Sequence, residues 1–492
     1  MHRGGSGGAL RLSTPLLLFA GVLGAMALRL VGLDWQSIAF DEGFSLAVSS
    51  SPWPLLFRAI LSDGVHPPLF YVLFKFALAL YGKTEFGARF LTAVFSVAAV
   101  PLLYRLGKTL FGGRVGRAAA LLLAVNPVHI WLAGEARMYS LFIFLAIFNF
   151  WMFWRFLRRA RRRDWFGMVG SAALVYGLHY FGLLLPVIQF LFILFTFRRS
   201  HRRLMPWVIG QATAGVPLLP WLALTAMRRV KSFGIAFLVV PTPADLLQSV
   251  WNLTLGLAPH LPALAAPGLL VVATGLALGV ISARRDAAAL LAGLWAFAPL
   301  LLVWLMSQKR SFYADRYLSF TIPALLLLIA SGLYRLGRLR WGNGLVAALI
   351  LLSLVNHWAL KGDPAFWKDD WRGAAAYITA RQRPDDIILL RSAHIKLPFD
   401  YYYHGPATEK LTSFNVESYD VSGLVEPGRR TWVVMPYTRR PTHYPMQPLT
   451  DASVWALDPD AGNVHDFLQA NESRILLSRR FLGVQVWLVG EE

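Results

Sequence analysis

Long apolar stretches alternate with short arginine-rich segments along this chain, and that alternation constrains the fold more than any other feature. Several stretches reach the roughly 20 apolar residues that a helix needs to cross a hydrocarbon core. Of the 492 residues, 56% are hydrophobic, which is more than soluble domains usually contain. We therefore predict a polytopic α-helical membrane protein.

The basic residues are distributed as in a membrane protein. A formal net charge of +21 would suit a nucleic-acid-binding protein, but the arginines gather in short loops such as 158–163 and 198–203. Cytoplasmic loops carry this excess of Lys and Arg, so we expect membrane lipids and no nucleic acid as partners. The chain contains no cysteine, which excludes disulfides, thiol nucleophiles and cysteine-ligated metals.

The loop charges also predict the topology. With a cytoplasmic tail over 1–14, the arginine-rich turns indicate about eleven transmembrane helices. Residues 67–81 are apolar but too few to span, so we expect an interfacial or re-entrant helix there. The expected spans are 15–33, 86–106, 117–133, 139–157, two short helices within 164–197, 205–224, 263–282, 287–306, 317–334 and 344–360.

The odd number of spans places the C-terminal part of the chain outside the membrane. The composition becomes that of a globular domain after residue 361. We predict a transmembrane domain over 15–361 with a first outer loop at 34–85, followed by a soluble extracytoplasmic α/β domain over 362–492. Apolar patterns in that domain predict helices at 371–383 and 464–477 and strands at 386–390, 431–435 and 484–489.

The first outer loop is rich in acidic and prolyl residues. It contains Asp41 and Glu42, then Asp63, and then His66 before two prolines. Carboxylates beside a bilayer are energetically expensive unless something uses them, so we expect chemistry at the outer face of the membrane. For Asp41 the alternative is a structural role as the N-cap of the helix that follows it.

Two outward segments are unusually basic and could hold an anion. Guanidinium groups bind phosphate in a bidentate manner, whereas the alternative is ordinary snorkelling of long side chains at the interface. The residues concerned are Arg228, Arg229 and Lys231 in one segment and Lys309, Arg310 and Arg316 in the other.

Five short motifs occur in register with this topology. Together they resemble the polyprenyl-phosphate-sugar-dependent GT-C glycosyltransferases, a superfamily that includes protein O-mannosyltransferases and the aminoarabinose transferase of lipid A. The resemblance covers about residues 15–340. The motifs are Asp41-Glu42, Asp63-x-x-His66-Pro67-Pro68-Leu69-Phe70-Tyr71, Gly134-Glu135-Ala136-Arg137-Met138-Tyr139, His179-Tyr180-Phe181 and Arg316-Tyr317.

The resemblance implies a hexosyl- or pentosyltransferase with a GT-C fold. Such an enzyme moves a sugar from a polyprenyl-phosphate donor to a lipid, polysaccharide or protein acceptor at the outer face, with inversion at the anomeric carbon. Asp41 matches the general base of the family. Its neighbour Glu42 either orients Asp41, binds the acceptor or faces away.

The resemblance also implies a set of substrate contacts. The donor phosphate would be surrounded by Arg137, Tyr139, Arg316 and Tyr317, and other contacts would come from Glu135, His179 and Tyr180. Simpler structural roles stay open for three of these residues. Arg137 could pair with Glu135 as an interfacial anchor, Tyr317 could belong to an aromatic belt, and His179 could be a satisfied polar group at a helix hairpin.

A divalent metal cation is a further expectation from the resemblance, because some members of the superfamily use one near the acids of the first outer loop. Asp41, Asp63 and His66 are the candidate ligands. The alternative for His66 is a hydrogen-bonding role without a metal.

Two other functions compete with glycosyl transfer. A transporter of lipid-linked sugars would usually contain paired repeats and polar residues near mid-membrane, whereas these acids gather at one face. A catalytically silent scaffold is the other alternative. The basic N-terminus and the absence of an organelle signal predict a bacterial inner membrane, with the N-terminus in the cytoplasm and the C-terminal domain outside.

Overall fold

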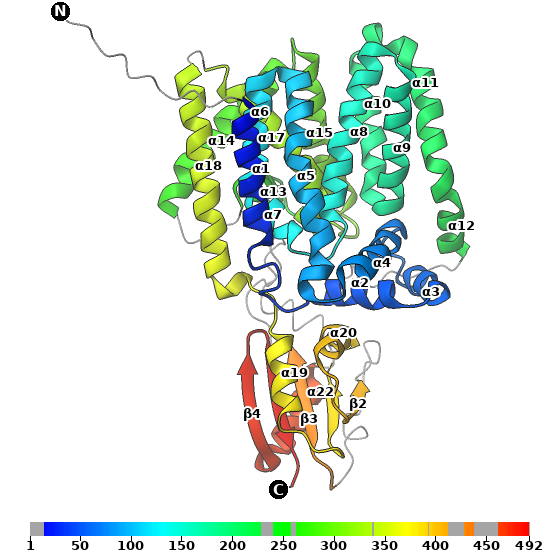
Figure 1. Ribbon diagram of the computed structural model, residues 1–492, viewed down its shortest axis with the longest axis vertical. Coiled ribbons are helices and arrows are strands. Elements are labelled where there is room, and N and C mark those ends of the chain that lie inside the picture. The colour runs from blue at the N-terminus through cyan, green and yellow to red at the C-terminus, as the bar shows by residue number, and fades with distance from the viewer. Residues whose placement is uncertain are drawn as a thin grey trace, which may run out of the picture.

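Helices build the first three quarters of the chain, and a sheet follows at one end of the bundle (Figure 1). The computed structural model describes residues 14–227, 240–256, 262–336, 339–391, 393–411, 428–436 and 461–491. The predicted anion-binding residues Arg228, Arg229 and Lys231 lie outside the described residues.

Most helices of the bundle run side by side (Figure 1). Their packing buries a continuous apolar core, in which every residue of α17 is buried. The helices are α1 (Thr14–Leu30), α5 (Glu85–Phe111), α6 (Gly113–Val125), α7 (Pro127–Ala133), α8 (Tyr139–Arg159), α9 (Arg162–Leu178), α10 (Leu184–Phe195), α11 (Phe197–Gly215), α12 (Leu219–Met227), α13 (Pro243–Leu255), α14 (Pro262–Ser282), α15 (Ala287–Met306), α16 (Asp315–Leu318), α17 (Ile322–Leu333) and α18 (Leu339–Gly362).

In the described part of the chain, six helices are long and apolar enough to cross a membrane, and a seventh span results if α6 and α7 are counted as one. These two helices meet at an angle of 56°. The break has a local cause, because the residue before a proline avoids the helical conformation and Asn126 precedes Pro127. The Asn126 side chain then accepts a hydrogen bond from His129 N at 2.8 Å and caps α7. Other apolar helices are shorter, so the expected count of about eleven stays a prediction.

Three short helices occupy the segment 34–85, the predicted first outer loop. They are α2 (Phe40–Ser50), α3 (Trp53–Asp63) and α4 (Leu69–Tyr81), and α2 and α3 lie across the end of the bundle nearest the sheet (Figure 1). At 1.5 Å per residue the 13 residues of α4 extend about 20 Å, which is too short for a hydrocarbon core of about 30 Å. Gly64, with φ of +63°, ends α3 in the left-handed conformation that glycine favours.

Two glycines of α14 let it approach α17 closely. A Cβ atom added at Gly275 would lie 3.0 Å from the carbonyl oxygen of Ile329, and one added at Gly279 would lie 2.7 Å from that of Leu328. Small residues four apart allow such backbone approach between membrane helices. The contact holds the buried helix α17, which follows the candidate site residues on α16.

We expect Gly279→Leu to separate α14 from α17 and to lower the free energy of unfolding by about 1–3 kcal/mol, the usual cost of overpacking a core. Gly293→Leu on α15 is the matched control, because no atom lies within 4 Å of a Cβ there. The melting temperature of the purified protein in detergent measures the effect. Equal melting temperatures for the two variants would contradict the prediction.

The C-terminal part forms a five-stranded mixed sheet with strand order β2-β1-β3-β5-β4. Strand β1 pairs in parallel with β2 and β3, whereas β5 is antiparallel to β3 and β4. Alternate residues of the strands contribute to two apolar clusters, one on each face. The elements are α19 (Trp371–Thr379), β1 (Ile387–Leu390), α20 (Ala393–Tyr402), β2 (Thr408–Leu411), β3 (Thr431–Pro436), α22 (Ala461–Ala470), β4 (Ile475–Phe481) and β5 (Val484–Val489).

The predicted helix over 464–477 is wrong in its second half. Helix α22 ends at Ala470, and Ile475 begins the edge strand β4, which returns through Gly483 to pair with β5. The apolar residues at 475–477 fit either a helix or a strand. Pairing with β5, which lies later in the chain, selects the strand.

Asp386, just before β1, anchors this sheet through a buried ion pair. Its carboxylate accepts hydrogen bonds from Arg430 Nη2 at 2.7 Å, Trp432 Nε1 at 2.8 Å and Arg383 N at 2.9 Å. Burial alone would raise the pKa of Asp386, but these donors hold it below its ordinary value. The ionised carboxylate therefore stabilises the fold.

We expect Asp386→Asn to destabilise the sheet at neutral pH by about 1.5–3 kcal/mol, the range for hydrogen bonds to charged groups. Because the folded pKa is lowered, the contribution is present above the ordinary aspartate pKa of about 3.9 and is lost as the pH falls through the folded value. Thermal unfolding at several pH values measures this. The exposed Asp385→Asn is the control, and an equal loss for both variants would disprove the role of the pair.

Candidate active site

Asp41 lies in the first turn of α2 and faces a buried arginine. Helix α2 begins at Phe40 with Ala39 as its N-cap, so the alternative role of Asp41 as an N-cap is wrong. The Asp41 Oδ2 atom accepts a hydrogen bond from Arg316 Nη1 at 3.0 Å. The side chain of Asp41 is 34% exposed and that of Arg316 only 9%, so the carboxylate is reachable while its partner is fixed.

Arg137 is the second buried guanidinium at this site. Its Nη1 atom lies 3.4 Å from the backbone oxygen of Asp41, 3.3 Å from Ser45 Oγ and 3.5 Å from the Tyr71 hydroxyl. These contacts join the loop before α8 to α2 and α4. The side-chain partners of Arg137 are thus in α2 and α4, and not at Glu135, the alternative that the sequence left open.

Four rings lie together beside the two guanidinium groups, and we call them the ring cluster: His66, Tyr139, His179 and Tyr317. The ring centroids of His66 and His179 are 5.1 Å apart, those of His179 and Tyr317 5.7 Å, and those of Tyr139 and Tyr317 6.3 Å. The Arg316 guanidinium lies over the Tyr317 ring, with Cζ 5.3 Å from its centroid. Residues from four distant motifs therefore meet at one place.

Several polar atoms of this group are buried without a hydrogen-bond partner. Such atoms cost about 1–3 kcal/mol each when nothing bonds to them, and each needs an explanation. A ligand rich in oxygen would satisfy them, because guanidinium, hydroxyl and imidazole groups can all donate. Within the described residues the atoms are His66 Nδ1, Arg137 Nε, Tyr139 Oη, His179 Nε2 and Arg316 Nε.

The imidazole of His66 is neutral in this setting. Burial lowers its pKa well below the ordinary value, and the nearby charges of Arg137 and Arg316 lower it further. His66 therefore offers a hydrogen-bonding ring without adding charge to the site.

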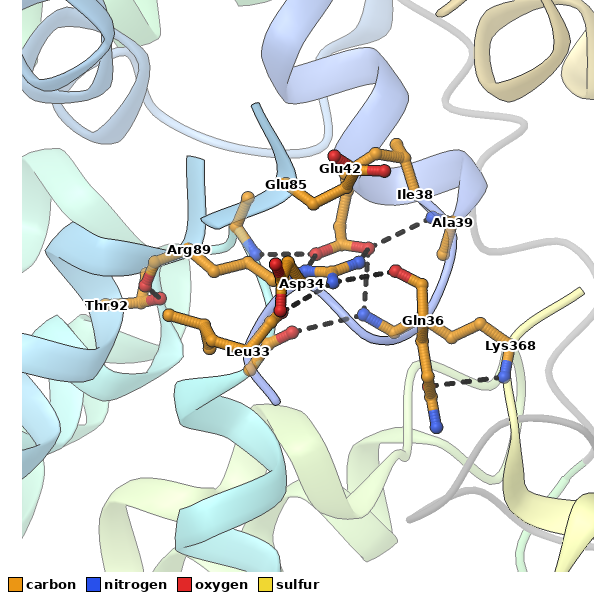
Figure 2. Close-up of polar contacts among 12 residues, drawn as sticks. Leu33, Asp34, Gln36, Ile38, Ala39, Glu42, Glu85, Arg89, Thr92 and Lys368 are labelled. Carbon is orange, nitrogen blue, oxygen red and sulfur yellow. Dashed lines mark hydrogen bonds and ion pairs between the residues drawn. The ribbon is translucent and has the colours of Figure 1, made fainter. Parts of the chain in front are cut away.

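Glu42, the residue next to Asp41, faces the other way into a saturated network. Its carboxylate accepts from Arg89 Nε at 2.8 Å and Nη2 at 2.9 Å (Figure 2). It also accepts from Lys368 Nζ at 2.8 Å and from the backbone nitrogens of Ala39 at 3.0 Å and Ala136 at 3.1 Å. Burial would raise the pKa of Glu42, but Arg89 and Lys368 together hold it well below its usual value. Of the three roles predicted for Glu42, this geometry favours the one in which the side chain faces away, where its network fixes the start of α2.

Arg89 completes the network from α5. Its Nη1 and Nη2 atoms donate to the backbone oxygens of Leu33, Gln36 and Ser37 at 2.8–2.9 Å (Figure 2). Sequence reasoning missed Arg89 and Lys368. The signal for Arg89 was available, since an arginine within an apolar span marks a functional position. Lys368 lies in a polar segment and carries no comparable signal.

The remaining predicted residues differ in their placement. Glu135 is buried near Lys368 and Glu42, whereas Tyr180 lies beside α12, where its hydroxyl accepts from Trp221 Nε1 at 3.1 Å. Lys309 and Arg310 of the predicted basic segment are exposed, whereas Arg316 is buried and contacts Asp41.

The structure does not assemble the predicted metal ligands. Among the described residues, no group of three or more His, Asp or Glu side chains could hold a metal ion. Asp41 is paired with Arg316 instead, and Asp63 Oδ2 accepts from Val65 N of its own turn at 3.3 Å. As placed here, Asp41, Asp63 and His66 therefore do not fit a metal centre.

A family model described as dolichyl-phosphate-mannose-protein mannosyltransferase matches residues 65–223. This segment contains His66, Arg137, Tyr139 and His179, whereas Asp41 and Arg316 lie on either side of it. No curated protein matches the chain.

Solved structures resemble the whole chain. ArnT from Cupriavidus metallidurans in the apo state has a TM-score of 0.62 at 15% identity, and the same protein bound to undecaprenyl phosphate has 0.60 at 15%; each match covers 96% of this chain and 99% of the other. The apo oligosaccharyltransferase of Archaeoglobus fulgidus has a TM-score of 0.53 at 12% identity, covering 87% and 70%. The resemblance to the GT-C glycosyltransferases that the motifs predict is thus confirmed, by fold over nearly the whole chain and by family model over residues 65–223.

Proposed function

We propose that this integral membrane protein is an inverting glycosyltransferase that moves a sugar from a polyprenyl-phosphate donor to an acceptor at the outer face of the membrane. The observation that carries the proposal is the pairing of partly exposed Asp41 with buried Arg316, beside Arg137 and the ring cluster. This reaction requires a base for the acceptor proton and fixed positive charge for the leaving phosphate. Asp41 would supply the base, Arg137 and Arg316 would supply the charge, and the unpartnered donors would bind oxygen atoms of the donor.

In this proposal the two arginines hold the donor phosphate. Arg316 and Arg137 stay cationic, and each has a buried Nε atom free to donate. The bond between the anomeric carbon and the phosphate oxygen breaks, and negative charge accumulates on the leaving polyprenyl phosphate. Fixed guanidinium groups stabilise that charge without reorganising. Tyr139 and Tyr317 line the same place and would contact the phosphate or the sugar.

Asp41 is the proposed general base. The acceptor hydroxyl attacks the anomeric carbon from the side opposite the phosphate, its proton passes to the Asp41 carboxylate, and the configuration inverts. A base must lie within hydrogen-bond reach of the proton that it removes, and Asp41 is the exposed carboxylate of the Asp41-Glu42 pair. A donor phosphate would compete with Asp41 for Arg316, and the acceptor hydroxyl would approach the partly exposed side of the Asp41 carboxylate.

We place the site at the outer face because α2 and α3 and the C-terminal sheet share one end of the bundle (Figure 1). The proposal keeps the tail 1–14 in the cytoplasm, the catalytic loop 34–85 within the transmembrane domain 15–361, and domain 362–492 outside a bacterial inner membrane. Lipid, polysaccharide and protein acceptors are all compatible with it.

We expect Asp41→Asn to reduce sugar transfer by at least about 100-fold, the lower range for loss of a general base, while polyprenyl-phosphate binding survives. The assay measures release of polyprenyl phosphate from a panel of polyprenyl-phosphate sugars, with a crude membrane extract as acceptor. Asp34→Asn is the control, since Asp34 is an exposed carboxylate of the same loop. Release that does not require Asp41 would disprove its role. No release from folded protein with any donor would favour a scaffold or a transporter.

Glu135 is a proposed substrate contact whose charge depends on pH. Burial raises its pKa to about 7, and the neighbouring Glu42 adds to this while Lys368 opposes it. We therefore expect the Glu135 carboxyl to be mostly protonated at pH 6 and mostly ionised at pH 8. Infrared difference spectra between these pH values measure the change, and Glu135→Gln removes it. An unchanged spectrum in Glu135→Gln would contradict the assignment.

A further inference from the structure

Lys368 reaches the candidate active site from the segment that leads into the C-terminal domain. It lies three residues before α19, yet its Nζ atom donates to Glu42 Oε2 at 2.8 Å and to the backbone oxygen of Gly134 at 3.1 Å. Its side chain is 10% exposed. One cation from the C-terminal part of the chain thus contacts two separate pieces of the site.

These two pieces of the site, α2 and the loop before α8, carry the proposed base and the proposed phosphate ligand, whose relative position must be kept. Glu42 is adjacent to Asp41 on α2, and Gly134 begins the loop that contains Arg137. The backbone nitrogen of Ala136 in that loop also donates to Glu42, at 3.1 Å. A displacement of α2 against this loop would therefore change the distance between the proposed base and the proposed phosphate ligand.

We propose that Lys368 is a positioning residue through which the C-terminal domain holds Asp41 and Arg137 in catalytic register. This inference rests on the proposed function. In this inference the C-terminal domain contributes to the reaction by fixing the geometry of the site, and not by binding the acceptor.

The domain also contacts the outer loop at places independent of Lys368. Tyr402 Oη accepts from the backbone nitrogen of Ile38 at 2.8 Å, and Arg372 pairs with Glu85 at 2.6 Å. Tyr401 donates to the backbone oxygen of Lys83 at 2.6 Å. Helix α20 packs against Gly43 of α2, where an added Cβ would lie 3.2 Å from the backbone of Leu397. Since these contacts dock the domain, loss of Lys368 alone should leave it docked.

The test compares Lys368→Met with Lys368→Arg. We expect Lys368→Met to lower kcat about 10- to 100-fold, because small misplacement of reacting groups has effects of this size, with the KM for the donor changed less than about twofold. Lys368→Arg keeps the charge and should recover most of kcat. Lys396→Met is the control, since Lys396 forms an ion pair on the same domain, with Asp400. An unchanged kcat, or a raised KM at normal kcat, would overturn the proposal.

Docking of the domain is measured separately. The chain has no cysteine, so spin labels at Ser62→Cys on α3 and Ser478→Cys on β4, both exposed, report the distance between the outer loop and the sheet. We expect the same distance distribution with and without Lys368→Met. A broadened distribution would mean that the lysine merely docks the domain, which contradicts a positioning role. If Lys368→Met does not fold, Lys368→Gln takes its place in every measurement.

Failure of the proposed function is distinguishable from failure of this inference. Transfer that needs Asp41 but not Lys368 would leave the function standing and remove the positioning role. If no donor supports transfer, the Glu135 titration still decides the placement of Lys368. Lys368 lowers the pKa of Glu135, so loss of that cation should shift the Glu135 titration to higher pH. The other charges that act on Glu135, those of Glu42, Asp41 and Arg316, stay the same in the variant. An unshifted titration would show that Lys368 does not act on this loop.

Discussion

The buried ion pair between Glu42 and Arg89 is the interaction on which the candidate site depends. Taking both charges out of water is costly, and such a pair persists only when further hydrogen bonds satisfy the remaining atoms. Here Glu42 accepts five hydrogen bonds, and Arg89 also donates to three backbone oxygens of the segment before α2. The network therefore ties α2 to α5, to the loop before α8 and to the segment before α19.

Two neighbouring carboxylates have different surroundings because of this arrangement. Successive residues of a helix point about 100° apart, so Glu42 can face the buried network while Asp41 faces Arg316 and remains one-third exposed. Glu42 is held ionised by Arg89 and Lys368. The Glu42 carboxylate is saturated with hydrogen-bond donors, whereas the Asp41 carboxylate is partly exposed and is the proposed acceptor of the substrate proton.

The proposed donor side of the site contains groups that lack hydrogen-bond partners. Arg137, Arg316, Tyr139, His66 and His179 each bury a polar atom without a hydrogen bond. Concentrating unsatisfied donors in one place opposes stability, and an oxygen-rich phosphate and sugar would offset that cost on binding. Preorganised donors of this kind also stabilise the charge that develops on a leaving phosphate.

Hydropathy, loop charge and motif order were readable from the sequence because each is a local property. They predicted a helical membrane protein of GT-C type, the short helix near 69–81, and most strands of the C-terminal sheet. Neither the bend at Asn126 nor the edge strand after Ala470 was foreseen. The bend has a local cause in the proline that follows Asn126, whereas the edge strand is selected by its pairing with β5. The metal ligands Asp41, Asp63 and His66 were placed together by residue type alone, whereas the fold pairs Asp41 with Arg316. The contacts of Glu42 with Arg89 and Lys368 join residues 47 and 326 positions apart. No local sequence pattern encodes such pairs. Glu42 needs cationic partners because it is buried, and only the packed tertiary structure determines that Arg89 and Lys368 are those partners.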